Sequence, residues 1–169
     1  MLLLFLTLAL VGPYALLTLA ERVFPSLKLE RRTRAKVGVS ALLLITASGH
    51  FLQADAMKEM LPPFVPGRLA IIYVTGVFEL LGAIGIWIPR VEKLAGACLV
   101  LMLIGVLPSN VYSAFNHVPF GGHEAGPAYL LVRVPFQLLL IAWIYVATGQ
   151  AWLRAHHPAG HGVAPTPSA

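Results

Sequence analysis

The stretch VTGVFELLGAIGIWIPR, Val74 to Arg90, combines a long apolar run with one acidic residue, Glu79, in its interior. It belongs to an apolar segment that runs from Leu69 up to Pro89. This is close to the roughly 20 residues that a helix needs to cross a bilayer core of about 30 Å. A charged side chain at that depth is costly, so it indicates a partner or a function inside the membrane. The stretch therefore predicts a membrane-spanning helix with a buried carboxyl group.

Four further segments of the chain have the same apolar character. The sequence has 169 residues, of which 58% are hydrophobic and only 11% are charged, and this composition excludes an ordinary soluble domain. No segment shows the alternating pattern of a transmembrane β-barrel. We therefore predict an all-α, polytopic membrane protein, a four-helix transmembrane bundle preceded by one additional N-terminal transmembrane helix. The other predicted spans are Leu2–Val23, Val37–Gln53, Leu94–His117 and Tyr129–Gly149.

The predicted spans divide the chain into four parts. Residues 1–24 form the N-terminal transmembrane helix, 25–36 a basic cytoplasmic connection, 37–150 the four-helix core and 151–169 a tail predicted to be disordered. We expect the first helix to be retained, because it lacks a basic start and is longer than the core of a signal peptide. Cleavage as a signal peptide is the alternative, and it would leave the orientation of the other four helices unchanged.

Basic residues are concentrated in the short connections between the predicted spans. The net charge of +5 therefore does not indicate nucleic-acid binding, since no soluble face carries it. Nine Lys and Arg residues fall on one side of the membrane and three on the other. By the positive-inside rule, this predicts an N-terminus outside and a C-terminus in the cytoplasm. The predicted cytoplasmic residues are Arg22, Lys28, Arg31, Arg32, Arg34, Lys36, Arg90, Lys93 and Arg154.

The sequence offers little for metal or redox chemistry. Cys98 is the only cysteine, so a disulfide, a CxxC redox pair and a thiolate cluster are excluded within the chain. His50 and His117 are the histidines to consider as axial haem or metal ligands, but their predicted depths differ by about 10 Å or more and no motif links them. We therefore expect no metal site and no cofactor carried by this chain. The tail histidines, interpreted as solvated, are His156, His157 and His161.

Polar side chains occur at converging depths in the last four spans. By a helix rise of about 1.5 Å per residue, Glu79 and Gln137 lie near the midplane, and other polar residues lie in the outer third or at the outer rim. Residues three or four apart in one segment share a helix face. We predict that these faces line a polar pocket that opens to the outer side. The candidates for ligand binding or proton relay are His50, Glu79, Asn110, His117, Arg133 and Gln137.

Glu79 needs a partner at its depth, and Arg133 is the cation that can reach it. This predicted ion pair is either purely structural or part of a ligand or proton site. For Asn110 and Gln137 the alternative is an interhelical hydrogen bond. Pro108 lacks an amide hydrogen, so it should free a carbonyl near residue 104 for a neighbouring polar group.

Four motifs follow one another in the order GHF (Gly49–Phe51), MLPPFVP (Met60–Pro66), VTGVFELLGAIGIWIPR and LPSNVYSAF (Leu107–Phe115). Over the region from Lys36 to Gly149, the chain resembles the DoxX-like family of small bacterial membrane proteins. The resemblance implies a four-helix bundle with a polar pocket in the bacterial inner membrane. Some family members are similar to membrane subunits of thiosulfate:quinone oxidoreductase, and related animal proteins are assembly chaperones for nicotinic acetylcholine receptors. The residues that match the family's recurring positions are Gly49, His50, Pro63, Glu79, Pro89 and Asn110.

Two hypotheses of function follow. In the first, the pocket binds a hydrophobic small molecule with a polar head, such as a quinone or a lipid-like compound. The chain is then an accessory subunit of a redox system, a membrane or periplasmic partner carries any redox cofactor, and Glu79 or His50 relays protons. In the second, the chain is a non-enzymatic assembly factor or chaperone, and the polar cluster only holds the bundle together. Because the chain has no redox centre, we do not expect the isolated chain to act as an enzyme.

Overall fold

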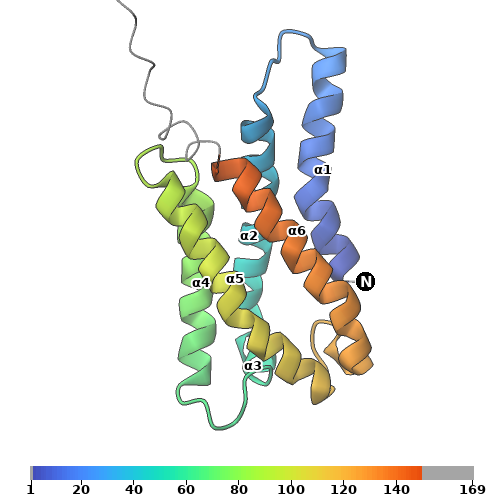
Figure 1. Cartoon of the computed structure of the whole chain (residues 1–169), viewed down its shortest axis with the longest axis vertical. Coiled ribbons are helices and arrows are strands. Elements are labelled where there is room, and N and C mark those ends of the chain that lie inside the picture. Colours follow the sequence, from blue (N-terminus) through green and yellow to red (C-terminus); the bar gives the residue numbers. More distant parts are fainter. Residues whose placement is uncertain (1, 150–169) are drawn as a thin grey trace, which may run out of the picture.

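The structure, a computed structural model, describes residues 2–149 (Figure 1). Within these residues every regular element is a helix, and five helices are long and apolar enough to cross a membrane. The prediction of an all-helical chain with five such helices is confirmed. The elements are α1 (Leu2–Val23), α2 (Arg31–Leu52), α3 (Ala54–Lys58), α4 (Arg68–Gly85), α5 (Glu92–Phe115), the 3-10 helix η1 (His123–Tyr129) and α6 (Leu130–Thr148).

The observed elements differ from the predicted ones at several places; α4, for example, ends at Gly85, short of Pro89. Helix α2 begins at Arg31 rather than Val37, so the second half of the predicted connection 25–36 is helical. The segment VPFGGHEAGPA (118–128), between two predicted spans, contains most of η1, which is interrupted at Gly126 with a φ of 75°. Helix α5 ends at Phe115, before the predicted end at His117. The predicted disordered tail 151–169, with its three histidines, lies outside the described residues.

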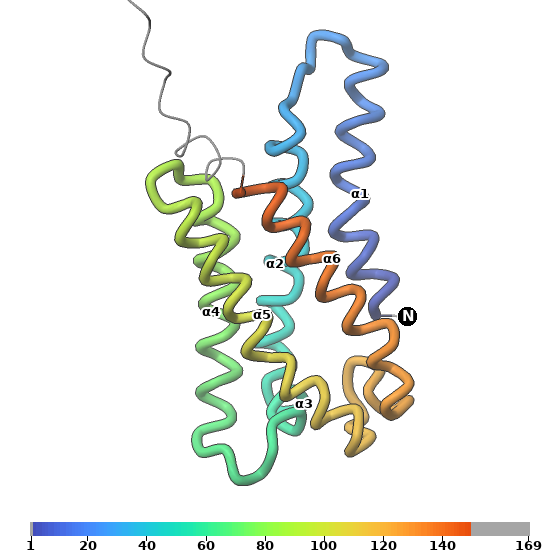
Figure 2. Tube along the Cα trace, in the orientation of Figure 1, coloured from blue at the N-terminus to red at the C-terminus, as the bar shows by residue number. Residues whose placement is uncertain are grey.

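Helix α2 is the centre of the bundle, because it packs against α1, α4 and α6. Figure 2 shows α5 crossing the bundle obliquely from the α4 side towards the start of α6. The connections α1–α2 and α4–α5 lie together at one end of the molecule, which we call the basic end (residues 22–36 and 86–93) (Figure 1). The segments that join α2 to α4 and α5 to α6 lie at the other end, which we call the cavity end (residues 53–67 and 116–129).

The bundle is apolar both inside and outside. Leu10, Leu42, Ile86 and Ile144 come from different parts of the chain, and each is at most 1% exposed. Many large apolar side chains of α4 and α5 instead point outward and are exposed. In water such a surface would be an unusually large apolar patch, whereas lipid tails cover it without cost. The surface therefore agrees with a bundle that spans a membrane.

A buried carboxylate joins two helices at the basic end. Glu92, the first residue of α5, is 6% exposed. Its Oε1 accepts a hydrogen bond from Arg32 Nη2 and lies 3.1 Å from Lys36 Nζ, and both cations belong to α2. Lys36 Nζ also lies 5.8 Å from the centre of the Trp87 ring. Such partners explain why the charged start of α2 is helical and packed, since each buried charge is paired.

Candidate functional site

A cavity of about 490 Å³ lies at the cavity end, with walls from α2, α3, α4, α5, α6 and the segment that joins α3 to α4. Most of its wall is aliphatic or methionine, and a few polar groups from four helices converge on it. Small-molecule sites in proteins have this character and volumes of about 300–1,000 Å³. The polar residues of the wall are His50, Thr75, Glu79, Ser109, Asn110 and Arg133.

His50, near the end of α2, is held by the facing helix α4. A Cβ atom at Gly76 would lie only 2.7 Å from the His50 Cβ, so the glycine lets the two helices approach. His50 Nδ1 lies 2.9 Å from the carbonyl oxygen of Ile72 and 3.1 Å from Thr75 Oγ1. A carbonyl oxygen only accepts hydrogen bonds, so Nδ1 donates and carries a proton. In the neutral ring, Nε2 is therefore an acceptor.

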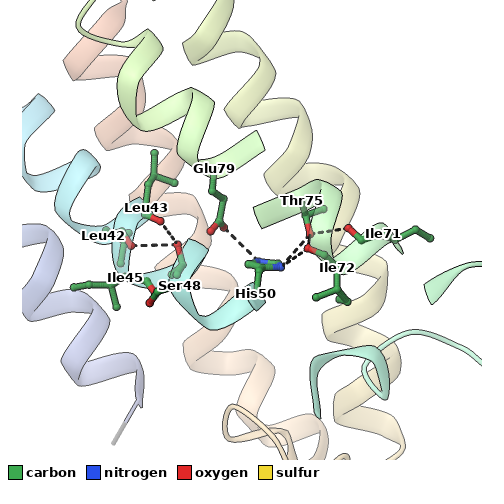
Figure 3. Close-up of polar contacts among 10 residues, drawn as sticks. Leu42, Leu43, Ile45, Ser48, His50, Ile71, Ile72, Thr75 and Glu79 are labelled. Atoms are coloured by element: carbon green, nitrogen blue, oxygen red, sulfur yellow. Dashed lines mark hydrogen bonds and ion pairs between the residues drawn. The ribbon is translucent and has the colours of Figure 1, made fainter. Parts of the chain in front are cut away.

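Glu79 lies on α4 and points towards this acceptor nitrogen (Figure 3). Its Oε1 is 3.7 Å from His50 Nε2, and its Oε2 is buried without a hydrogen-bond partner among the described residues. A carboxylate oxygen and a neutral imidazole nitrogen cannot hydrogen-bond to each other, because both only accept. Favourable contact requires one proton on either the carboxyl group or the ring. The pair is thus suited to hold a single proton and to pass it on.

Arg133 does not pair with Glu79, which corrects the predicted ion pair. Arg133 Nε donates to Asn110 Oδ1 over 3.3 Å, and its guanidinium carbon lies 5.9 Å from the centre of the Phe136 ring. Within residues 2–149, the cation-forming side chain that reaches within 4.0 Å of the Glu79 carboxylate is His50. Helix α6 packs on α2 and α5, whereas α2 packs directly on α4. This packing brings the histidine, and not the arginine, to the carboxylate.

Gln137 joins two helices and does not line the cavity. Its Nε2 donates to the carbonyl oxygen of Leu103 on α5 over 2.7 Å. Pro108 was expected to free a carbonyl near residue 104, and the acceptor of Gln137 is adjacent to that position. Gln137 Oε1 is buried and has no partner in the described part of the chain. The Gln137 side chain therefore links α5 to α6 by an interhelical hydrogen bond.

His117 lies away from the other predicted site residues. It follows the end of α5, it is exposed, and it has a positive φ of 51°. Its Nδ1 lies 3.1 Å from the carbonyl oxygen of Glu124. Because the helix stops at Phe115, His117 does not continue the face of Asn110, and it does not line the cavity with His50.

Most of the cavity wall was not predicted from the sequence, including Thr75, Met57 and Met60. Thr75 touches His50, and Met57 and Met60 enter the wall from α3 and the segment that follows it. The Ser113 hydroxyl lies 2.7 Å from the Ser109 carbonyl oxygen and 3.1 Å from the Met60 carbonyl oxygen, so its one hydrogen is shared between them and links this segment to α5. The prolines of MKEMLPP (57–63) indicate that no helix continues through this segment. The position of the segment over the cavity, however, depends on the tertiary fold. Methionine walls adapt to ligands of different shape.

Comparison with protein-family models gives one match, over residues 39–148, to the family described as Domain of unknown function (DUF8561). The matched region begins in α2 and ends at the last residue of α6, so it contains the whole cluster of His50, Glu79, Asn110 and Arg133. Helix α1 precedes it. Comparison with curated proteins and with solved structures gives no match. Since more than half of the chain matches, the chain belongs to the DUF8561 family.

Proposed function

We propose that this chain binds a hydrophobic small molecule with a polar head, of the quinone or lipid-like class, as an accessory subunit of a membrane redox system. The observation that carries the proposal is the His50–Glu79 pair in the wall of an otherwise apolar cavity of about 490 Å³. A purely structural pair would be expected to be enclosed by protein. Here the unpartnered Glu79 oxygen and the open volume beside it favour a ligand.

The apolar and the polar residues of the cavity wall suit the tail and the head group of such a ligand, respectively. Met57, Met60, Met102 and Leu103 offer apolar contact for a tail. Arg133 offers hydrogen-bond donors for a head group, because Asn110 occupies only its Nε. A quinone carbonyl or a lipid ester oxygen accepts such donors.

The proton chemistry of the proposed site belongs to the His50–Glu79 pair. A quinone takes up protons when a partner protein reduces it, and a hydroquinone releases them when it is oxidised. Glu79 Oε1 lies 3.7 Å from His50 Nε2, and in the proposed mechanism this pair delivers a proton to, or accepts one from, the ligand oxygen. The electrons come from the partner, which carries the redox cofactor.

The proposed location follows from the charge distribution and from the DoxX-like resemblance. The basic end would face the cytoplasm of a bacterium and the cavity end the periplasm, with the chain in the inner membrane. A membrane or periplasmic partner would then approach the cavity end.

The proposal is tested by native mass spectrometry of the full chain purified in detergent, with identification of the small molecules that it retains. We expect a bound quinone or similar amphiphile in the wild type and its loss in Glu79→Gln, which removes the charge and keeps the shape. Glu21→Gln is the control, because Glu21 lies in the last turn of α1, pairs with Arg34 and does not line the cavity.

A wild-type chain without a ligand, or a ligand that Glu79→Gln retains equally, would contradict the proposal. Either result would favour the assembly-factor or chaperone role, in which the polar cluster only stabilises the bundle.

A further inference from the structure

A second cavity, of about 330 Å³, lies against the polar cluster. The two cavities share part of their walls, so the polar cluster is accessible from both. The residues common to both walls are His50, Met57, Met60, Glu79, Asn110 and Arg133.

The rest of the second cavity comes from two parts of the chain that are far apart in sequence. The start of α1 contributes Leu2, Leu3, Phe5 and Leu6. The segment between α5 and α6 lies beside it, and a Cβ atom at Gly121 would lie 3.9 Å from the Leu2 side chain. Helix α1 precedes the region that matches the family, so this wall is an addition to the matched core.

The segment between α5 and α6 brings one buried polar side chain, His123, to the second cavity. It is 2% exposed and its ring packs edge-on against Tyr129, with 4.7 Å between the ring centres. Its Nδ1 lies 2.8 Å from the carbonyl oxygen of Phe120, so Nδ1 is the donor and the neutral ring keeps Nε2 as an acceptor. This Nε2 is buried and has no hydrogen-bond partner within residues 2–149.

The backbone around His123 is shaped to hold the ring in place. Gly121, Gly122 and Gly126 all have positive φ, at 69°, 102° and 75°. A Cβ atom at Gly122 would lie 2.7 Å from the ring of Tyr129, which supports His123. A side chain there would combine backbone strain with a clash. The segment is therefore specialised for this arrangement, even though it leaves a buried acceptor unsatisfied, which costs about 1–3 kcal/mol.

We propose that the second cavity receives the hydroxyl-bearing head of the ligand and that an O–H group of this head donates to His123 Nε2. This inference rests on the proposed function and makes it specific. The second hydroxyl of a hydroquinone would face the His50–Glu79 pair, which lines the same cavity and also accepts hydrogen bonds. A quinone has only acceptor oxygens and cannot satisfy His123. The site thus selects the reduced form of its ligand.

The experiment is isothermal titration of the full chain in lipid nanodiscs with a decyl-substituted benzohydroquinone and with the corresponding quinone. The wild type should bind the hydroquinone about tenfold more tightly, which is the effect of one good hydrogen bond. His123→Phe should weaken binding of the hydroquinone about tenfold and leave the quinone unchanged. His117→Asn is the matched control, since His117 is an exposed histidine of the same segment and does not line the second cavity.

A second variant covers the case in which His123→Phe does not fold. Gly49 lies in the wall of the second cavity, and a Cβ atom there meets no atom within 4 Å. Gly49→Leu should therefore fill the second cavity, leave His123 intact and weaken hydroquinone binding.

The outcomes separate the two proposals. Wild-type protein that binds both forms equally, or a His123→Phe variant that keeps the wild-type preference, would overturn the role of His123 and leave the proposed function standing. Wild-type protein that binds neither form would overturn the role of His123 and, with it, a quinone as the ligand of the proposed function.

Discussion

Two buried glutamates at opposite ends of the bundle have different surroundings. Glu92, at the basic end, is 6% exposed and lies against two basic side chains, Arg32 and Lys36. Glu79, near the cavity end, is 8% exposed and lies against one titratable histidine. Neither oxygen of Glu92 is buried and unpartnered, whereas Oε2 of Glu79 is. The two residues cannot be distinguished by burial alone.

The difference lies in what each carboxylate can still do. Glu92 lies against two cations and has no buried unpartnered oxygen within the described residues, so it can fix the register between α2 and α5 but offers no free acceptor to a ligand. Glu79 lies 3.7 Å from His50 Nε2 and lines the cavity, so it can respond to a ligand. A buried charge in a membrane bundle is thus better judged by its partners and by the space beside it than by its depth.

The largest effect on stability is expected at the basic end. Glu92→Ala should lower the free energy of unfolding by about 3 kcal/mol, because Arg32 and Lys36 lose their counter-ion in a buried place. The measurement is unfolding by SDS in mixed micelles, followed by circular dichroism. Ligand retention by the folded fraction should not change. A loss below about 1 kcal/mol would show that the pairing at this end is not structural.

The next effect concerns the approach of α2 to α4. Gly76→Ala should lower the free energy of unfolding by about 1–3 kcal/mol and release the ligand, because the new methyl group collides with His50. Gly105→Ala is the control, since Gly105 lies in the cavity wall and a Cβ atom there meets nothing within 4 Å. We expect Gly105→Ala to be neutral or to stabilise the helix by up to about 1 kcal/mol. Equal losses in both variants would argue against close packing at Gly76.

A smaller effect separates the observed partner of Glu79 from the predicted one. A double-mutant cycle of Glu79→Gln with His50→Gln should give a coupling energy of at least about 0.5 kcal/mol. The cycle of Glu79→Gln with Arg133→Gln should give less, because these side chains do not meet. The same unfolding assay measures both. A larger coupling with Arg133 would restore the pair expected from the sequence.

The smallest effect is expected from the exposed pair between Lys58 and Asp55 on α3. The Asp55 carboxylate accepts a hydrogen bond from Lys58 and raises the pKa of Lys58 above the ordinary value of 10.5. A raised lysine pKa adds stability below pH 10.5 that is lost as the pH rises through the raised value. Since Asp55 is mostly exposed to solvent and Lys58 is partly exposed, Asp55→Asn should leave the unfolding midpoint at pH 7 unchanged. A clear shift would give this surface pair a structural role.

Much of the fold could be predicted from the sequence because membrane insertion depends on local composition. The five helices follow from the lengths of the apolar runs, and prolines and charged residues mark several of their ends. The start of α2 was misjudged, since its arginines are stabilised by Glu92 and Glu21, which are distant in sequence.

The candidate site was predicted only in part. Helical spacing and depth suggested that His50, Glu79, Asn110 and Arg133 converge, and the structure places all four in one cavity wall. His123 was not identified, because its burial depends on a segment with three positive-φ glycines that brings it next to α1.

The sequence by itself determined how many apolar helices the chain has and which polar groups they carry, because hydropathy and spacing are properties of single segments. Only the tertiary structure decided which of these polar groups contact one another. Glycine at position 76 allows α4 to approach α2, so Glu79 meets His50, and the packing of α6 on α5 takes Arg133 to Asn110. Such pairings depend on which helix faces touch, and a one-dimensional pattern does not contain that information.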